Sequence, residues 1–222
     1  MNDLKNLVNF WNDCFNNNDK IEVTDYKNLV PSKKLYEALE ILSKEDKVLD
    51  YGCGDGWASI ILAKVGCKDV TASDMAPNAI KMAKEYSKAY QVDSNINFKL
   101  INDDYLNNEL DNYYDGVFCS NVLDVVPMDV SQSIIKFLYR VVKENGLVII
   151  GLNYYLDLDK APNGFKVIDK NVYINDILRL VSLTDEEWVN IFSEYFTIEK
   201  TIHFSWPNEN VERRRIFYLR KR

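Results

Sequence analysis

The sequence predicts an α/β fold in which helices cover a mostly parallel sheet. Short apolar runs typical of strands recur along the chain, at residues 48–49, 69–74, 96–101, 116–119 and 147–150. Between them, residues 77–90 and 130–142 carry apolar side chains at helical spacing. Strands that alternate with helices indicate a parallel sheet with crossover helices.

The chain has the length expected of one elaborated domain. Its 222 residues, 47% of them hydrophobic, can form one well-cored unit, residues 1–222. We expect a helical cap, a core that contains the alternating strands and helices, a tyrosine-rich insertion or lid, and a closing helix with two strands. The predicted bounds of these parts are 1–45, 46–151, 152–183 and 184–222.

Two helix starts carry local signals. Pro31 suits the first turn of a helix in the cap. Thr184 and Glu187 are three residues apart, as in a capping box, so a helix is expected to begin there. Residues 196–204 and 215–220 then read as the two closing strands.

The charge of the chain argues against a nucleic-acid partner. Lysine and arginine number 27 against 34 acidic residues, which gives a net charge of −7. Polyanion binding needs concentrated positive charge, and the one basic run is residues 213–215. Because this run precedes an apolar segment, we expect it to be the solvated start of a strand.

Other features of the sequence indicate a soluble, cytoplasmic protein. The first residues lack the basic start and apolar stretch of a signal peptide, and no segment approaches the length of a membrane span. No membrane partner is therefore expected. The cysteines have no paired spacing that suggests a metal site or a disulfide, so no metal is expected; they are Cys14, Cys53, Cys67 and Cys119.

Three glycines on alternate positions follow the first strand. Residues 48–57 read VLDYGCGDGW, and the apolar spacing after them predicts a helix. Glycine allows unusual backbone conformations and close approach of a ligand, and a helix start presents unpaired N–H groups. The turn is therefore typical of a nucleotide cradle. A dinucleotide-binding turn has glycine at the sixth position counted from its first glycine, here Gly52. Trp57 occupies that position, so the turn does not match the dinucleotide fingerprint.

The turn resembles the first motif of the class I S-adenosylmethionine-dependent methyltransferases. That motif has two hydrophobic residues, an aspartate and three alternate glycines, as residues 48–56 do. The resemblance implies S-adenosylmethionine as the cofactor. It also implies cofactor contacts from the turn, namely Asp50, Tyr51, Gly52, Cys53, Gly54 and Gly56.

Three later segments extend the resemblance in the family's order. Asp74 ends the second strand, where the family holds the ribose hydroxyls, and Met75 should flank the adenine. A carboxylate suits a free diol because it accepts both hydroxyl protons. The third motif places an acidic residue near the adenine amino group. The candidates for that region are Asp103, Asp104 and Tyr105, and the choice between the two aspartates stays open.

Residues 114–123 resemble the family's fourth strand, which ends beside the methionine part of the cofactor. Ser120 and Asn121 take those positions, and residues 143–150 match the turn into the fifth strand. The resemblance implies a three-layer, doubly wound fold. Its sheet should have seven mostly parallel strands with an antiparallel last strand, plus an N-terminal helical cap.

The acceptor is expected to be a small molecule, methylated on oxygen or nitrogen. Residues 120–123 lack the prolines and aromatic residue of the family's amino-methylating nucleic-acid enzymes, and the chain has no Pro-Cys pair for cytosine methylation. Alternatives are an aminopropyl transferase, a nicotinamide-dependent reductase, or a non-catalytic module that keeps the cofactor pocket. The sequence leaves the oligomeric state open.

The acceptor site is expected in the cap and the insertion, where aromatic residues could exclude water and face the sulfonium. These residues are Trp11, Phe15, Tyr26, Tyr154, Tyr155 and Tyr173. Asp124, just past the fourth strand, is a candidate catalytic group, with turn chemistry as the alternative. His203 is a candidate general base because it is the only histidine, with a packing or surface role as the alternative.

Overall fold

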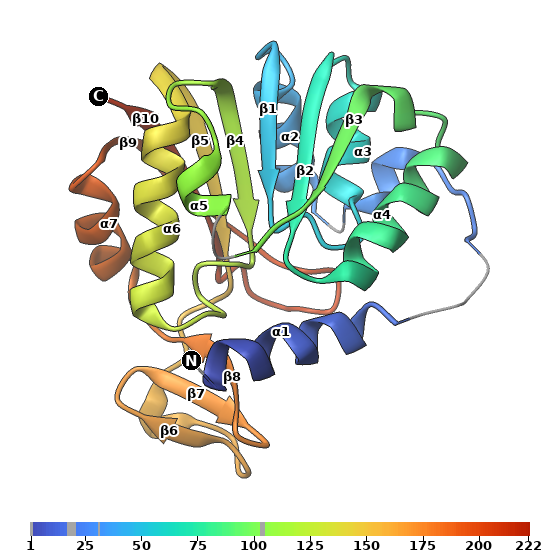
Figure 1. Ribbon diagram of the computed structural model, residues 1–222. Helices are drawn as coiled ribbons and strands as arrows, with labels where there is room; N and C mark the ends of the chain where they lie inside the picture. Colours follow the sequence, from blue (N-terminus) through green and yellow to red (C-terminus); the bar gives the residue numbers. More distant parts are fainter. Residues whose placement is uncertain (1, 17–20, 31, 103–104) are drawn as a thin grey trace.

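The computed structural model describes residues 2–16, 21–30, 32–102 and 105–222. Its main sheet has seven strands in the order β3-β2-β1-β4-β5-β10-β9 (Figure 1). The strands are β1 (Lys47–Tyr51), β2 (Asp69–Asp74), β3 (Ile96–Leu100), β4 (Tyr114–Ser120), β5 (Val142–Leu152), β9 (Phe196–Phe204) and β10 (Arg214–Lys221).

The pairing of these strands confirms the predicted sheet. β1 lies in the middle of the parallel part and pairs with β2 on one side and β4 on the other. Val48 and Leu49 of β1 are completely buried, one against each layer of helices. The last strand, β10, is antiparallel to both of its neighbours, β5 and β9. The fold is therefore the doubly wound, mostly parallel sheet that the sequence indicates.

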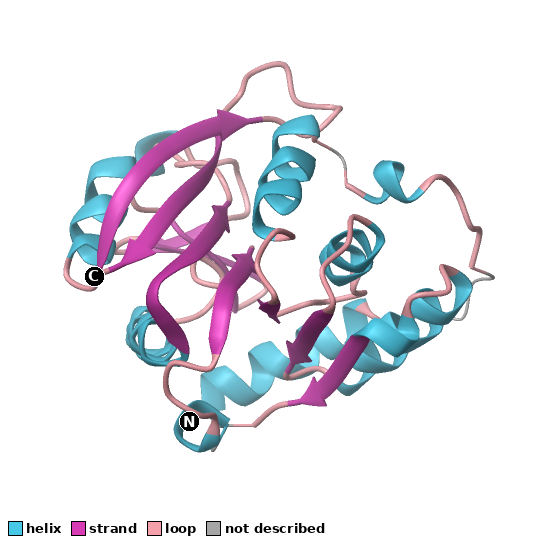
Figure 2. Cartoon of the chain, turned by 90° about the horizontal axis from the view of Figure 1, so that it is seen from above, coloured by secondary structure: helices cyan, strands magenta, loops and turns pink. Residues whose placement is uncertain are grey.

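Helices cover both faces of the sheet, and Figure 2 shows them on both sides of the strands. One hydrophobic cluster joins the sheet to the helices α2 (Lys33–Leu42), α3 (Trp57–Lys64) and α4 (Pro77–Ala89). The other joins it to α5 (Tyr105–Asn108), α6 (Met128–Val141) and α7 (Asp185–Ser193). The capping box at the start of α7 is present, with Thr184 and Glu187 bonded to each other's backbone N–H groups. Pro31 lies outside the described residues.

Two further elements lie beyond the carboxyl ends of the parallel strands (Figure 1). The first is the N-terminal helix α1 (Asn2–Cys14). The second is a three-stranded antiparallel sheet in the expected insertion, formed by β6 (Lys166–Ile168), β7 (Asn171–Ile174) and β8 (Ile177–Val181). α1 packs on β8 and on α4. The sequence predicts the insertion but not this small sheet. Short 3-10 turns complete the fold at Tyr26–Leu29, Asp93–Asn95 and Leu158–Lys160.

The arginine run at residues 213–215 differs from its predicted solvated character. Arg213 is exposed, but only 1% of the surface of Arg215 is accessible. The Arg215 guanidinium donates to the backbone oxygens of Asn153 at 2.8 Å and Leu183 at 2.6 Å. Arg215 thus ties the end of β5 to the start of α7.

No helix among the described residues is both long and apolar enough to cross a membrane.

Candidate functional site

The turn between β1 and α3 requires its glycines. Gly52, Gly54 and Gly56 have φ values of +73°, +54° and +84°, in the region that side chains disfavour. A Cβ atom on Gly52 would lie 2.3 Å from Cγ2 of Val122. The N–H groups of Gly52 and Cys53 both donate to the Ser73 carbonyl oxygen, at 2.8 and 3.0 Å, so the turn is fixed to β2.

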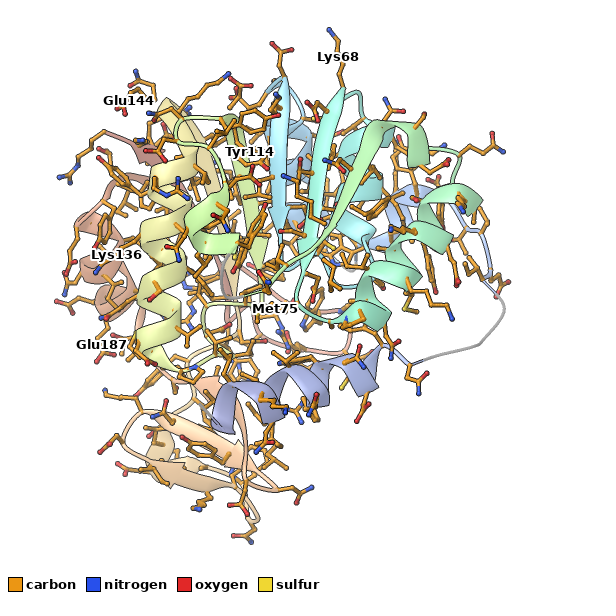
Figure 3. The ribbon with its side chains drawn as sticks, viewed as in Figure 1. Lys68, Met75, Tyr114, Lys136, Glu144 and Glu187 are labelled. Atoms are coloured by element: carbon orange, nitrogen blue, oxygen red, sulfur yellow. The ribbon has the colours of Figure 1, made fainter. Side chains whose placement is uncertain are left out.

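Asp74 lies at the end of β2, beside this turn. Its carboxylate accepts the backbone N–H of Gly54 at 2.9 Å and that of Ala76 at 2.9 Å. Burial raises the pKa of Asp74, while these N–H groups oppose the rise. Met75 follows it, and Figure 3 shows this side chain between the lower edge of the sheet and α1.

A cavity of about 710 Å³ opens at this carboxyl edge, and the strand ends form one of its walls. Eight of the predicted cofactor residues line it: Tyr51, Gly52, Cys53, Gly54, Asp74, Met75, Ser120 and Asn121. The structure brings these eight residues together at one cavity, and their contact with the cofactor stays a prediction. Burial raises the pKa of the Cys53 thiol well above its ordinary value, so Cys53 is a neutral filler of the turn.

The opposite wall comes from α1 and the small sheet. α1 contributes Leu4, Leu7, Val8 and Trp11, and Phe15 follows this helix directly. The small sheet and its loop contribute Phe165, Val172, Ile174, Arg179 and Leu180. Of the aromatic residues predicted for a lid, Trp11, Phe15 and Tyr154 line the cavity. Tyr26, Tyr155 and Tyr173 are not among its lining residues.

α1 is held over the site by a pair of asparagines. The Asn78 backbone N–H donates to Oδ1 of Asn12 at 2.9 Å, and the Asn78 side chain donates to the Asn12 backbone oxygen at 3.0 Å. Asn78 lies in the first turn of α4, whose N-cap residue, Ala76, has no side-chain cap. Asn12 therefore satisfies a free N–H of α4 and, in doing so, places Phe15 over Gly54.

Three of the predicted cofactor residues do not line the cavity. The buried Asp50 carboxylate accepts the Ser59 hydroxyl of α3 at 2.5 Å, and burial raises its pKa to about 7. Gly56 starts α3 next to Ala83, and Tyr105 packs its ring against Phe137. Asp50 thus contacts α3, and Gly56 lies next to α4. Asp103 and Asp104 lie outside the described residues.

The two candidate catalytic residues also lie outside the cavity wall. Asp124 is completely buried, and its carboxylate accepts the Asn153 N–H at 2.6 Å. Burial raises the pKa of Asp124 to about 6, opposed by the Asn153 N–H and the charge of Arg215. His203 is on the surface of β9, with Nε2 2.7 Å from Oδ2 of Asp185. The structure thus places Asp124 against Asn153 behind the wall and His203 on the surface beside Asp185, and a catalytic role for either residue stays a prediction.

The cavity wall also contains polar residues that the sequence reasoning missed. Asp55 and Asn102 lie near the cofactor residues in sequence, and Asn153 follows β5. Arg179 of β8 and Arg214 of β10 line the cavity from segments far along the chain. No local sequence signal marks these two arginines, because their convergence depends on the way β8 and β10 return to the carboxyl edge.

The fold and this site are typical of proteins that bind a nucleoside-type cofactor at the carboxyl ends of parallel strands. Comparison with known sequences identifies the family: the methyltransferase domain family matches residues 48–146. A ubiquinone biosynthesis O-methyltransferase from Glaesserella parasuis is 30% identical over an alignment of 184 positions, which covers 74% of this chain and 74% of that protein. A ribosomal protein methyltransferase from Acetivibrio thermocellus is 36% identical over 103 residues, but these are 46% of this chain and 30% of that protein. The chain thus spans only part of these relatives.

Solved structures share the fold at low sequence identity. The N-methyltransferase NodS from Bradyrhizobium japonicum, in complex with S-adenosyl-L-homocysteine, has a TM-score of 0.68 at 17% identity, over 97% of this chain and 98% of that one. Magnesium protoporphyrin IX methyltransferase from Synechocystis, with bound S-adenosylmethionine, has a TM-score of 0.64 at 18% identity, over 97% of both chains.

The chain belongs to the class I S-adenosylmethionine-dependent methyltransferases. Its methyl donor is S-adenosylmethionine, and the residues at the carboxyl edge fit this cofactor. Gly54 presents bare backbone to the cavity, and a Cβ there would already lie 3.1 Å from Cζ of Phe15. The Asp74 carboxylate stands next to it with acceptor capacity beyond its two backbone partners.

Proposed function

We propose that this methyltransferase transfers the methyl group to an oxygen or nitrogen atom of a small molecule held in the cavity. The observation that supports this most strongly is the cavity wall that α1 and the small sheet form opposite the strand ends. The chain's own α1 and β6–β8 stand opposite the strand ends and enclose about 710 Å³ with mainly apolar side chains. That volume is within the range of about 300–1,000 Å³ typical of small-molecule sites.

The cofactor is proposed to lie along the strand ends. Asp74 would accept the ribose hydroxyls, Met75 would pack on the adenine, and Ser120 and Asn121 would face the methionine part. The cofactor supplies the activated methyl group when bound. Binding at the strand ends leaves the space beside α1 and β8 for the acceptor.

The chain's own contribution to the reaction is proposed to be positioning and exclusion of water. Methyl transfer is an in-line displacement, so alignment of the acceptor atom with the methyl group and sulfur accounts for much of the rate. Trp11, Phe15 and Tyr154 provide aromatic surface around the transfer region and displace water from it. Asp124 holds Asn153 in the wall through its hydrogen bond to the Asn153 N–H.

The name of the Acetivibrio relative suggests a different acceptor, a protein. The experiment that separates the two is incubation with S-adenosylmethionine and a metabolite extract or a protein extract, with methylated products identified by mass spectrometry. The proposal predicts methylated small molecules that need the active enzyme. Methylation of proteins alone would contradict it, and cofactor binding without any product would indicate the non-catalytic module.

A further inference from the structure

We infer that the acceptor carries a carboxylate on an apolar body and that Arg179 of β8 binds this carboxylate. The inference rests on the proposed function, because it places the acceptor in the same cavity. It adds the chemical class of the acceptor and a residue that determines specificity.

Arg179 is a charged group in the cavity wall that makes no ion pair with any of the described residues. Its guanidinium lies 4.5 Å from the centroid of the Phe10 ring and 5.8 Å from that of Trp11. These cation–π contacts hold it against α1. Within the described part of the chain, Arg179 has no hydrogen bond and no ion pair, so its donors remain available to a ligand.

Arg214 also lies in the cavity wall, but its guanidinium has hydrogen-bond partners within the protein. Its Nε lies 3.0 Å from both carboxylate oxygens of Glu209, and its Nη2 lies 2.8 Å from Oε1. Its Nη1 donates to Oδ1 of Asn153 at 2.6 Å. The charge of Arg214 is therefore paired with Glu209, whereas the charge of Arg179 has no such partner among the residues that the structure describes.

The remaining charges in the wall favour an anion beside Arg179. Asp55 and Asp74 both lie at the glycine turn, where they repel an anionic acceptor group. A charge in a partly buried, apolar setting is costly unless it is paired. The planar guanidinium donates two parallel hydrogen bonds to a carboxylate, which is the geometry that arginine favours.

The other residues of this wall indicate the chemical character of the rest of the acceptor. α1, which Arg179 contacts, and the small sheet, to which it belongs, line the cavity with the apolar side chains of Leu4, Leu7, Val8, Val172, Ile174 and Leu180. Such a surface binds a hydrocarbon or aromatic body rather than a sugar or a peptide backbone. The acceptor is thus an apolar carboxylic acid with a nucleophilic oxygen or nitrogen atom.

The test uses acid and amide pairs that differ only in charge: phenylacetate, 3-phenylpropionate and octanoate, each with its primary amide. Binding is measured by calorimetry on protein saturated with S-adenosylhomocysteine. The variants are Arg179→Met and, as the matched control, Arg213→Met. Arg213 is an exposed arginine 4.7 Å from the Tyr154 ring and is not among the residues that line the cavity.

The wild type should bind at least one acid about tenfold more tightly than its amide. Arg179→Met should remove that preference and leave the affinity for the amide and for S-adenosylhomocysteine unchanged, while Arg213→Met should behave as the wild type. Equal binding of acid and amide in all three pairs, or no binding of any acid, would overturn the inference. A loss of S-adenosylhomocysteine affinity in Arg179→Met would also overturn it, because Arg179 would then bind the cofactor carboxylate. Failure of the proposed function is separate, since it would appear as no methylated small molecule.

Discussion

The Asp74 carboxylate accepts the backbone N–H of Gly54 at 2.9 Å, so the end of β2 and the glycine turn after β1 form one hydrogen-bonded unit. The two residues are 20 positions apart in sequence and are brought together by the parallel pairing of β1 with β2. The residue proposed to accept the ribose hydroxyls therefore also fixes the turn over which the cofactor would pass.

The three glycines of the turn should differ in what their substitution costs. In Gly56→Ala, the new Cβ would lie 2.9 Å from the Ala83 Cβ at a φ of +84°. The α3–α4 contact should be strained, which should lower the free energy of unfolding by about 1–3 kcal/mol. Gly66→Ala is the control, because Gly66 has a φ of +113° and nothing within 4 Å of its Cβ position. Urea denaturation of both variants distinguishes the effect of the Ala83 contact from that of backbone strain. Equal losses in the free energy of unfolding would mean that the contact with Ala83 is unimportant.

Gly54→Ala should act on ligand binding more than on folding. Its Cβ would point into the cavity, 3.1 Å from Cζ of Phe15, where the proposed cofactor position begins. The variant should fold and lose most of its affinity for S-adenosylhomocysteine in calorimetry. An affinity equal to that of the wild type would show that Gly54 is needed only for the backbone conformation of the turn and not for close approach of the ligand.

Asp124→Asn should leave methyl transfer intact, because Asp124 lies behind the wall and an asparagine oxygen can still accept the Asn153 N–H. With the pKa of Asp124 at about 6 in the folded protein against an ordinary 3.8, the unfolded chain releases this proton first. The free energy of unfolding of the wild type should therefore decrease as the pH rises from about 4 to about 6, because Asp124 loses its proton over this range.

The Asp124→Asn variant lacks that fall, so its stability relative to the wild type should rise by up to about 3 kcal/mol across this range. Denaturation at pH 4 and pH 7 tests this, with the exposed Asp159→Asn as the control. A variant that binds S-adenosylhomocysteine normally but has lost turnover would restore Asp124 as a catalytic base.

Asn12→Ala should loosen α1. The substitution removes the oxygen that accepts the Asn78 N–H and leaves that N–H at the start of α4 without its partner. We expect faster hydrogen exchange in α1 and weaker binding of S-adenosylhomocysteine, since Phe15 would no longer be held over Gly54. Asn9→Ala, an exposed site on the same helix, is the control. Unchanged exchange in Asn12→Ala would show that apolar packing alone holds α1.

The sequence predicts the parts of the site that lie in local motifs. It does not predict the parts that depend on contacts between segments far apart in the chain. Gly52 and Asp74 belong to motifs of fixed spacing at strand ends, so their meeting follows from parallel pairing. β6, with three residues, is too short for an alternating pattern to be recognised. Arg179 and Arg215 read as ordinary polar positions, because sequence alone does not place β8 against α1 or β10 against Asn153.

Calorimetric titration with S-adenosylhomocysteine and its 2′-deoxy analogue tests the central claim most directly. The wild type should bind the natural ligand, and Asp74→Ala should weaken it by about ten- to a hundredfold, because charge-assisted hydrogen bonds are worth about 1.5–3 kcal/mol. The 2′-deoxy analogue should lose much less on the same substitution. Asp69→Asn, at the exposed start of the same strand, should bind as the wild type does. Wild-type affinity in a folded Asp74→Ala protein, or an equal loss for both ligands, would contradict the assignment of the ribose to Asp74.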